Sequence, residues 1–126
     1  MTQIVNALTV DVEDYFHVAA FNQVIKPSDW GGMQWRFNQN TRRMLDLFDQ
    51  FGVKATFFVL GWCAERDKEL VAEIDRRGHE VASHGYSHQL VYSQTPEQFR
   101  SETIKSKDIL ESITGKPVKG YRAASY

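Results

Sequence analysis

Residues 78–88 have the sequence GHEVASHGYSH, and this stretch decides how the chain folds. Gly78 is a typical helix-ending residue, and it follows a segment with helical periodicity. Residues 79–83, centred on Val81 and Ala82, are interpreted as a short strand. This strand leads directly into polar residues, so the stretch predicts a helix, then a strand, then a polar cluster at the carboxyl end of that strand.

The same alternation of strand and helix extends on both sides of this stretch. The predicted strands are 4–12, 53–60, 79–83 and 118–122. The predicted helices are 40–51 and 65–77, followed by one that begins with the capping box Thr95-Pro96-Glu97-Gln98 and ends at Gly115. Because strands that alternate with helices through short connections form parallel sheets, the sequence predicts an α/β fold with right-handed crossovers.

Residues 15–37 lack helical or strand periodicity and are rich in aromatic side chains. The segment is longer than a routine connection, which makes it a candidate functional loop. Its aromatic residues suit stacking against a ligand, although aromatic side chains in a long loop more often form a small core of the loop itself. These residues are Tyr15, Phe16, Trp30 and Trp35.

The composition excludes several classes of protein. The 126 residues carry 15 Lys and Arg against 16 Asp and Glu, so no basic stripe is available to bind nucleic acid. Cys63 is the only cysteine, which rules out a disulfide or a thiolate-rich zinc site within one chain. No stretch approaches the roughly 20 apolar residues of a membrane span, and residues 1–8 do not resemble a signal peptide. We therefore expect a cytoplasmic protein without a membrane segment.

Polar residues follow three of the predicted strands, at 11–14, 84–88 and 122–125. Ligands of parallel sheets gather at the carboxyl ends of the strands, so these residues form the candidate site. His84 and His88 are four residues apart, and both imidazoles would point the same way if the segment forms a helical turn. Two histidines and one carboxylate leave open positions on a divalent ion, as in catalytic sites. By itself, however, this spacing more often belongs to a surface histidine and a capping histidine.

The carboxylates strengthen the metal-site hypothesis. Asp11, Glu13 and Asp14 end a buried strand, where unpaired charge is costly, so they need cations nearby. A metal ion and Arg122 are the only cations that the strand ends supply. The alternative is that the acidic residues form a solvated cap for the next segment, a role that Asp14 alone could fill.

Three motifs resemble those of the polysaccharide deacetylases with a NodB-homology domain, carbohydrate esterase family four. Residues 8–14 (LTVDVED) resemble the first motif, residues 84–88 (HGYSH) the second, and residues 121–125 (YRAAS) the third. Residues 55–59 and 78–83 are also similar to the family, so the resemblance covers nearly the whole chain. The DVEDYF sequence further resembles bacterial members associated with exopolysaccharide loci.

The resemblance implies a distorted (β/α) barrel and metal-dependent hydrolysis of N-acetyl or O-acetyl groups on an acetylated polysaccharide or oligosaccharide. It makes Asp11 the general base that accepts a proton from water, and Arg122 the partner that keeps this base ionised and oriented. His84 and His88 become two ligands of a divalent ion, for which zinc is the first candidate. The backbone N–H of Ser125 would help to stabilise the oxyanion.

The chain departs from the family pattern in two of these motifs. The first motif commonly has two adjacent aspartates, the second of which binds the metal, whereas Val12 follows Asp11 here. A subset of the family has Asp-x-Asp, which makes Glu13 the preferred metal ligand and Asp14 the alternative. The two-residue alternation of a strand also places Asp11 and Glu13 on one face. In the third motif Ala124 replaces the usual proline, which loosens the turn.

The resemblance also implies a domain larger than this chain. A (β/α) barrel needs about 200 residues or more, so we interpret residues 1–126 as the amino-terminal part of a deacetylase catalytic domain. His17 and His79 match no motif for the acid that protonates the leaving amine, and structural roles are expected for both. We therefore expect the chain by itself to be inactive. An incomplete parallel sheet exposes an edge strand, which a homo-oligomer could cover.

Two other functions remain compatible with the sequence. One is a metal-independent amidase of the same fold that acts on small cyclic amides, although the combination of Asp11, His84 and His88 argues against it. The other is a non-catalytic remnant that binds sugar or metal. Metal analysis separates the amidase from the other two functions, and turnover of an acetylated oligosaccharide separates the deacetylase from the remnant.

Overall fold

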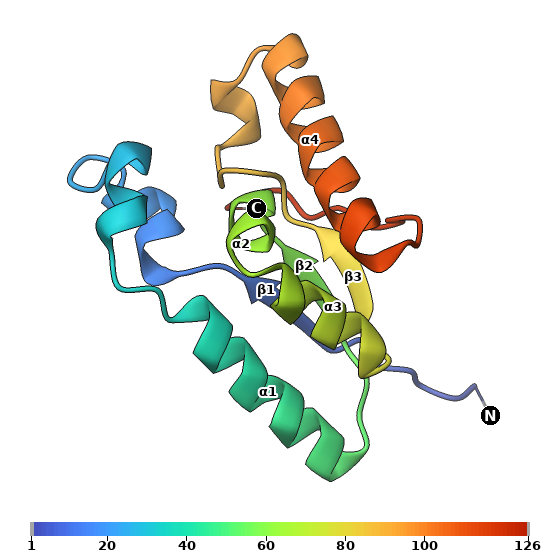
Figure 1. Cartoon of the computed structure of the whole chain (residues 1–126). Coiled ribbons are helices and arrows are strands. Elements are labelled where there is room, and N and C mark those ends of the chain that lie inside the picture. The colour runs from blue at the N-terminus through green and yellow to red at the C-terminus, as the bar shows by residue number, and fades with distance from the viewer. Residues whose placement is uncertain (1, 126) are drawn as a thin grey trace.

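The computed structural model describes residues 2–125, and its central element is a three-stranded parallel sheet (Figure 1). The strands are β1 (Thr9–Val12), β2 (Thr56–Val59) and β3 (Glu80–Ser83), in the order β1-β2-β3. Both strand pairs are parallel, so the carboxyl ends of all three strands lie at the same edge. The predicted α/β fold with a parallel sheet is therefore confirmed, and the sheet is open, as in one part of a barrel.

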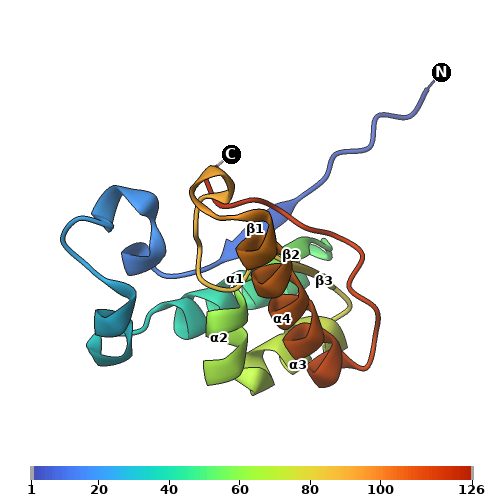
Figure 2. The same ribbon diagram turned by 90° about the horizontal axis from the view of Figure 1, so that it is seen from above.

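Helices connect the strands and lie on one face of the sheet (Figure 2). The four α-helices are α1 (Phe37–Phe51), α2 (Gly61–Arg66), α3 (Lys68–Arg76) and α4 (Pro96–Thr114). The short 3-10 helices are η1 (Tyr15–His17), η2 (Ala19–Phe21), η3 (Pro27–Gly32) and η4 (Val91–Ser93). Within residues 2–125, none of the helices has the length and apolar character needed to cross a bilayer.

Alternate residues of each strand face the helices and form the core. Phe57 and Val59 of β2 are fully buried in one apolar cluster with Leu45 of α1, Ile74 of α3 and Leu110 of α4. Three helices are thus attached to the central strand through side chains that avoid water. The intervening strand residues point to the opposite face of the sheet, and Asp11 of β1 is one of them.

The predicted helix 65–77 is divided into α2 and α3. Asp67 lies between them: its backbone N–H donates to the carbonyl of Cys63 and ends α2, while its side chain accepts a hydrogen bond from Leu70 N–H and caps α3. An aspartate at this position favours a new helix start. The break allows α2 to bury Trp62 next to the 15–37 loop while α3 packs on β3.

The predicted strands were too long, and the first and the last of them differ most from the structure. Residues 118–122 form a single bridge, between Ser83 and Tyr121, in place of a fourth strand. Residues before Tyr121 do not extend the bridge along β3: the N–H of Val118 donates instead to Oε1 of Glu111 in α4. At the other end, β1 begins only at Thr9, and Ile4 and Val5 are 86% and 84% exposed. Apolar, β-branched composition predicted a strand there, but neither side chain has a core to pack against.

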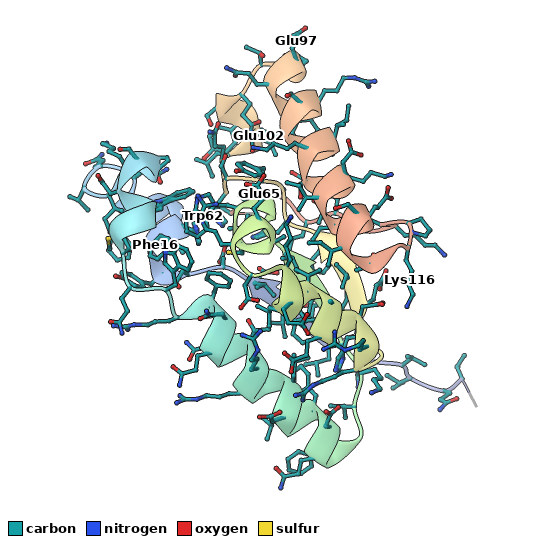
Figure 3. All side chains as sticks on the ribbon, viewed as in Figure 1. Phe16, Trp62, Glu65, Glu97, Glu102 and Lys116 are labelled. Carbon is teal, nitrogen blue, oxygen red and sulfur yellow. The ribbon has the colours of Figure 1, made fainter. Side chains whose placement is uncertain are left out.

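The 15–37 loop folds around a small aromatic core. Phe16 and Trp30 are buried and pack against Trp62 of α2, with ring centroids 5.8 and 5.6 Å from it. Figure 3 shows Phe16 and Trp62 side by side between the loop and α2. His17 lies between Trp30 and Trp62, at centroid distances of 4.5 and 4.9 Å. Phe16 and Trp30 therefore form a core of the loop and are not available for stacking on sugars.

His17 is a buried titratable side chain inside this aromatic core. Its Nδ1 accepts a hydrogen bond of 2.7 Å from the backbone N–H of Asp14, which requires the neutral imidazole with its proton on Nε2. Burial lowers the pKa of His17 from its usual 6.5 to about 4. His79 is likewise buried, and its Nδ1 accepts from Ala55 N–H. Both histidines thus have structural contacts, as expected from the sequence.

We expect His17 to lower the free energy of unfolding as the pH falls from 6.5 to 4. In this range the unfolded chain takes up a proton on His17 that the folded chain excludes, so protonation favours the unfolded state. The variant His17→Phe keeps an aromatic ring but does not titrate, and its stability should depend less steeply on pH over this range. Urea unfolding at several pH values measures both slopes. Equal slopes would mean that His17 titrates normally in the folded state.

Candidate metal centre

Polar side chains from two strand ends meet at the carboxyl edge of the sheet. Glu13 directly follows β1, while His84 and His88 belong to the segment that follows β3. Metal-ligating atoms of these three side chains lie within 4.8 Å of one another. The fold thus brings one carboxylate and two imidazoles together from distant parts of the sequence, at the edge where ligands of parallel sheets bind.

A single oxygen of Glu13 lies between the two imidazoles. Its Oε2 is 2.9 Å from Nε2 of His88 and 3.4 Å from Nε2 of His84. Both imidazoles are buried, and Oε2 has no well-oriented hydrogen-bond donor among the residues that the structure describes. A buried carboxylate oxygen needs compensation. The three atoms therefore surround a point that suits a cation.

The backbone of Arg122 orients the imidazole of His84. Nδ1 of His84 lies 2.9 Å from the carbonyl oxygen of Arg122. A carbonyl can only accept a hydrogen bond, so Nδ1 carries the proton and donates it. In the neutral imidazole this leaves the lone pair on Nε2, the atom that faces Glu13, as a metal ligand requires.

The electrostatics of the cluster keep Glu13 ionised. Burial raises the pKa of the Glu13 carboxyl, but its interactions with His84 and His88 outweigh burial and lower the pKa to about 2. For His84, burial lowers the pKa, while the Glu13 carboxylate and the Arg122 carbonyl raise it above the usual 6.5. The carboxylate is therefore charged at neutral pH, which is the form that binds metal ions.

The histidines converge through a non-helical backbone turn, and not through the helical turn considered for their four-residue spacing. Residues 84–88 are not helical, and Gly85 has a φ of 77°. His88 also has a positive φ, 53°, which is rare for a residue with a Cβ. The two imidazole centroids are nevertheless 5.2 Å apart. The spacing pointed to the right pair of residues, but the glycine between them selects a tighter, left-handed path.

Asp11 and Arg122 form an ion pair beside the cluster. Nη1 of Arg122 donates to Oδ1 of Asp11 at 2.7 Å, and Oδ2 of Asp11 lies 3.9 Å from Nε2 of His84. Sequence reasoning missed two further contacts of the guanidinium: Nη2 donates to Oγ1 of Thr9 at 3.0 Å, and the group stacks 4.1 Å from the ring centroid of Phe58. Thr9 lies two residues before Asp11 on one strand face, and Phe58 is the register partner of Asp11 on β2. The two-residue alternation along β1 was the feature of the sequence that could have predicted the contact of Arg122 with Thr9.

Asp14 lies outside the cluster, although it was the alternative ligand. Its carboxylate accepts hydrogen bonds from three backbone N–H groups, those of Tyr15, Arg36 and Phe37. These bonds cap η1 and connect it to the start of α1. The alternative interpretation of Asp14 as a cap is therefore the one that the geometry matches. Because Asp14 follows Glu13 directly, the two carboxylates point in different directions.

Ser125 lies on the wall of a cavity that adjoins Glu13, His84 and His88. The cavity has a volume of about 380 Å³ and is lined by Asp11, Glu13, Val18, His84, His88 and Ser125. Ser125 has a φ of 52°, so both non-glycine residues with positive φ in residues 2–125, Ser125 and His88, line this cavity. Each such conformation costs about 1–3 kcal/mol, and strained residues of this kind concentrate at functional sites.

The donor set fits a divalent metal ion. Two imidazole nitrogens and one carboxylate oxygen converge, and one imidazole is oriented by a hydrogen bond from its other nitrogen, as metal-binding histidines generally are. The buried Oε2 without a well-oriented donor is the observation that favours a cation over a simple hydrogen-bonded cluster. The adjoining cavity leaves room for further ligands.

Comparison with known proteins identifies relatives that are longer than this chain. A peptidoglycan-N-acetylglucosamine deacetylase of Bacillus cereus is 37% identical over 75 residues, which are 60% of this chain and 27% of that protein. The structure of the Bc1960 peptidoglycan N-acetylglucosamine deacetylase matches with a TM-score of 0.70 and 30% identity over 93% of this chain and 44% of that chain. A pseudoenzyme of carbohydrate esterase family four, BA3943 from Bacillus anthracis, has the same fold, with a TM-score of 0.72 and 21% identity over 94% of this chain and 34% of that chain. The chain therefore spans less than half the length of each of these relatives.

One protein-family model matches most of the chain. The model described as polysaccharide deacetylase matches residues 27–125, a range that contains His84, His88 and Arg122. Asp11 and Glu13 precede the matched range, so their place in the site rests on the geometry given above. The solved structures share the fold over 94% and 93% of the chain. The chain belongs to the polysaccharide deacetylase family.

Proposed function

We propose that the chain is the amino-terminal part of a metal-dependent deacetylase domain that removes acetyl groups from an acetylated polysaccharide or oligosaccharide. The observation that carries the proposal is the position of Glu13 Oε2 between the Nε2 atoms of His84 and His88. These three side chains would hold a divalent ion. When bound, such an ion supplies Lewis-acid activation of water and of an acetyl carbonyl.

Asp11 is the general base of this proposal. Its Oδ1 is occupied by Arg122 at 2.7 Å, while its Oδ2 faces the cluster, 3.9 Å from Nε2 of His84. The guanidinium orients the carboxylate, which in its ionised form accepts a proton from the attacking water. Arg122 is itself held by Thr9 and Phe58, so the base has a defined orientation.

Ser125 is the proposed oxyanion donor. A backbone N–H at this place on the cavity wall would donate to the acetyl oxygen as that oxygen gains negative charge. The left-handed backbone conformation of Ser125 supports a constrained, functional position. The cavity of about 380 Å³ has room for an acetamido or acetoxy group.

Zinc is the proposed ion. Two imidazoles and a carboxylate are the ligand set of catalytic zinc sites, in which a further position stays open for water or substrate. Imidazole ligands also favour zinc over magnesium or calcium, which prefer oxygen ligands. The chemistry of the donors therefore supports zinc without any thiolate.

An N-acetylated sugar polymer is the proposed substrate class. The Bacillus cereus relative named for peptidoglycan N-acetylglucosamine deacetylation supports this class. Within the cavity, the titratable residues are Asp11, Glu13, His84 and His88, and each of them has another role in the proposal. None remains to protonate the leaving amine. We therefore propose that residues 1–126 alone bind the metal without releasing acetate.

Glu13→Gln should weaken zinc binding far more than Asp14→Asn. Removal of a ligand should exceed the roughly 10-fold to 100-fold loss that follows removal of an outer partner, whereas Asp14 only anchors the loop. Equilibrium dialysis with elemental analysis of the folded variants measures zinc content, with the double variant His84→Ala/His88→Ala as the zinc-free reference. If Asp14→Asn empties the site and Glu13→Gln does not, Asp14 is the ligand.

Asp11→Asn should leave zinc content nearly unchanged and lower acetate release by about 10² to 10⁴, the contribution of a general base. Acetate release from N-acetylglucosamine oligomers is measured in a domain of the relatives' length that contains this segment. Loss of zinc in Asp11→Asn would make Asp11 a ligand, and an unchanged rate would place the base elsewhere. A zinc-loaded domain that releases no acetate would favour the non-catalytic binding function.

A further inference from the structure

Two buried hydroxyl groups lie directly behind the histidine turn, residues 84–88. Ser106 of α4 is fully buried, and Ser83 of β3 is 3% exposed. The N–H of Gly85 donates to Ser83 Oγ at 3.1 Å, and Ser106 Oγ donates to the carbonyl oxygen of Gly85 at 2.9 Å. The two hydroxyl oxygens are 2.9 Å apart. Together these groups form a closed ring of hydrogen bonds that starts and ends on the backbone of one residue.

The direction of every hydrogen bond in this ring is determined. The N–H of Gly85 can only donate and its carbonyl can only accept. The proton of Ser106 goes to that carbonyl, so the proton of Ser83 must go to Ser106 Oγ. Each hydroxyl therefore donates once and accepts once. A ring with one allowed direction has little freedom to rearrange while it stays buried.

Glu102 holds the other side of the histidine turn. Its Oε2 accepts from the N–H of Ser87 at 3.2 Å and from the hydroxyl of Ser87 at 3.0 Å. Figure 3 shows Glu102 on the side of α4 that is turned toward the segment after β3. Glu102, Ser106 and Leu110 are four residues apart, so they share one face of α4. Leu110 is buried in the core and anchors the helix, while the other two residues meet the turn.

The turn depends on such contacts because the backbone of His88 has an unfavourable conformation. Its φ of 53° lies in the left-handed region that residues with a Cβ rarely adopt. The carbonyl of Gly85 also accepts from the N–H of Gly61, and the carbonyl of Tyr86 accepts from the N–H of Trp62, both in α2. The shape of the turn is thus determined by two helices that pack against it, α2 through backbone groups and α4 through side chains.

We propose that Ser106 and Glu102 are positioning residues of the metal centre, which fix the histidine turn and thereby the separation of the two imidazoles. This inference rests on the proposed function, because it requires that both histidines bind one ion. Ser106 and Glu102 act through the backbone of the turn, since their hydrogen bonds go to Ser83, Gly85 and Ser87. Two side chains of one helix therefore set the geometry of the ligands.

Loss of the Ser106 or Glu102 side-chain contacts should lower metal affinity more than it lowers folding stability. Without the Ser106 hydroxyl, the buried hydroxyl of Ser83 loses its acceptor, and the turn can move to relieve this cost. A small movement suffices, because metal–ligand distances tolerate only about 0.2 Å. The core contacts of α4 through Leu110 would remain in place. Affinity and stability are therefore separable measurements.

The test compares zinc dissociation constants of the 126-residue chain, measured by competition with a chromophoric chelator, with urea unfolding of the metal-free chain. Ser106→Ala and Glu102→Ala should each weaken zinc binding by about 10-fold to 100-fold, the usual effect of losing a supporting partner. Glu102→Gln retains an oxygen that accepts both bonds from Ser87, so it should recover most of the affinity. Should Ser106→Ala fail to fold, the two Glu102 variants decide the question.

Leu110→Ala is the matched control. It lies on the same face of α4 and lowers stability without touching the turn, so its zinc affinity should equal that of the wild type. The proposal is overturned if Ser106→Ala and Glu102→Ala bind zinc as the wild type does, or if Leu110→Ala weakens binding equally. A wild-type chain that binds no zinc, or binds it equally after His84→Ala, removes the proposed metal centre and this inference with it.

Discussion

Oε2 of Glu13, 2.9 Å from Nε2 of His88 and 3.4 Å from Nε2 of His84, is the centre around which the rest of the site is arranged. The carboxylate is largely buried, and a buried charge is stable only with a partner of opposite sign. Oε2 has no well-oriented hydrogen-bond donor among the described residues, so a cation between it and the two imidazoles would supply the opposite charge. These three side chains form the proposed metal centre.

Glu13 and the two histidines are held in place by different parts of the fold. On the β1 side, Asp14 connects the aromatic loop to α1, and Arg122 reaches across β2 to Asp11. On the β3 side, α4 holds the histidine turn through Glu102 and Ser106. The consecutive carboxylates of Glu13 and Asp14 therefore have separate roles, one in the cluster and one in the scaffold, because successive residues at a strand end point in opposite directions.

Period-two alternation along β1 was enough to predict that Asp11 and Glu13 share a face, and the parallel order of the strands was enough to predict that their polar ends meet. The conformation of the histidine turn could not be predicted in this way, because four-residue spacing fits a helical turn equally well and only the positive φ of Gly85 distinguishes the two. The hydrogen bond between Ser83 and Ser106 depends on how α4 packs on β3. Such tertiary contacts leave no local pattern in the sequence.

The most direct test of the central claim is X-ray absorption spectroscopy of the zinc-loaded chain at one zinc per molecule. The claim predicts a first shell of nitrogen and oxygen atoms at about 2.0–2.2 Å. It also predicts outer-shell scattering from two imidazoles, which falls to one imidazole or is lost with the zinc in His88→Ala. Zinc held without imidazole scattering, or with a spectrum unchanged in His88→Ala, would contradict the claim that Glu13, His84 and His88 form the metal centre.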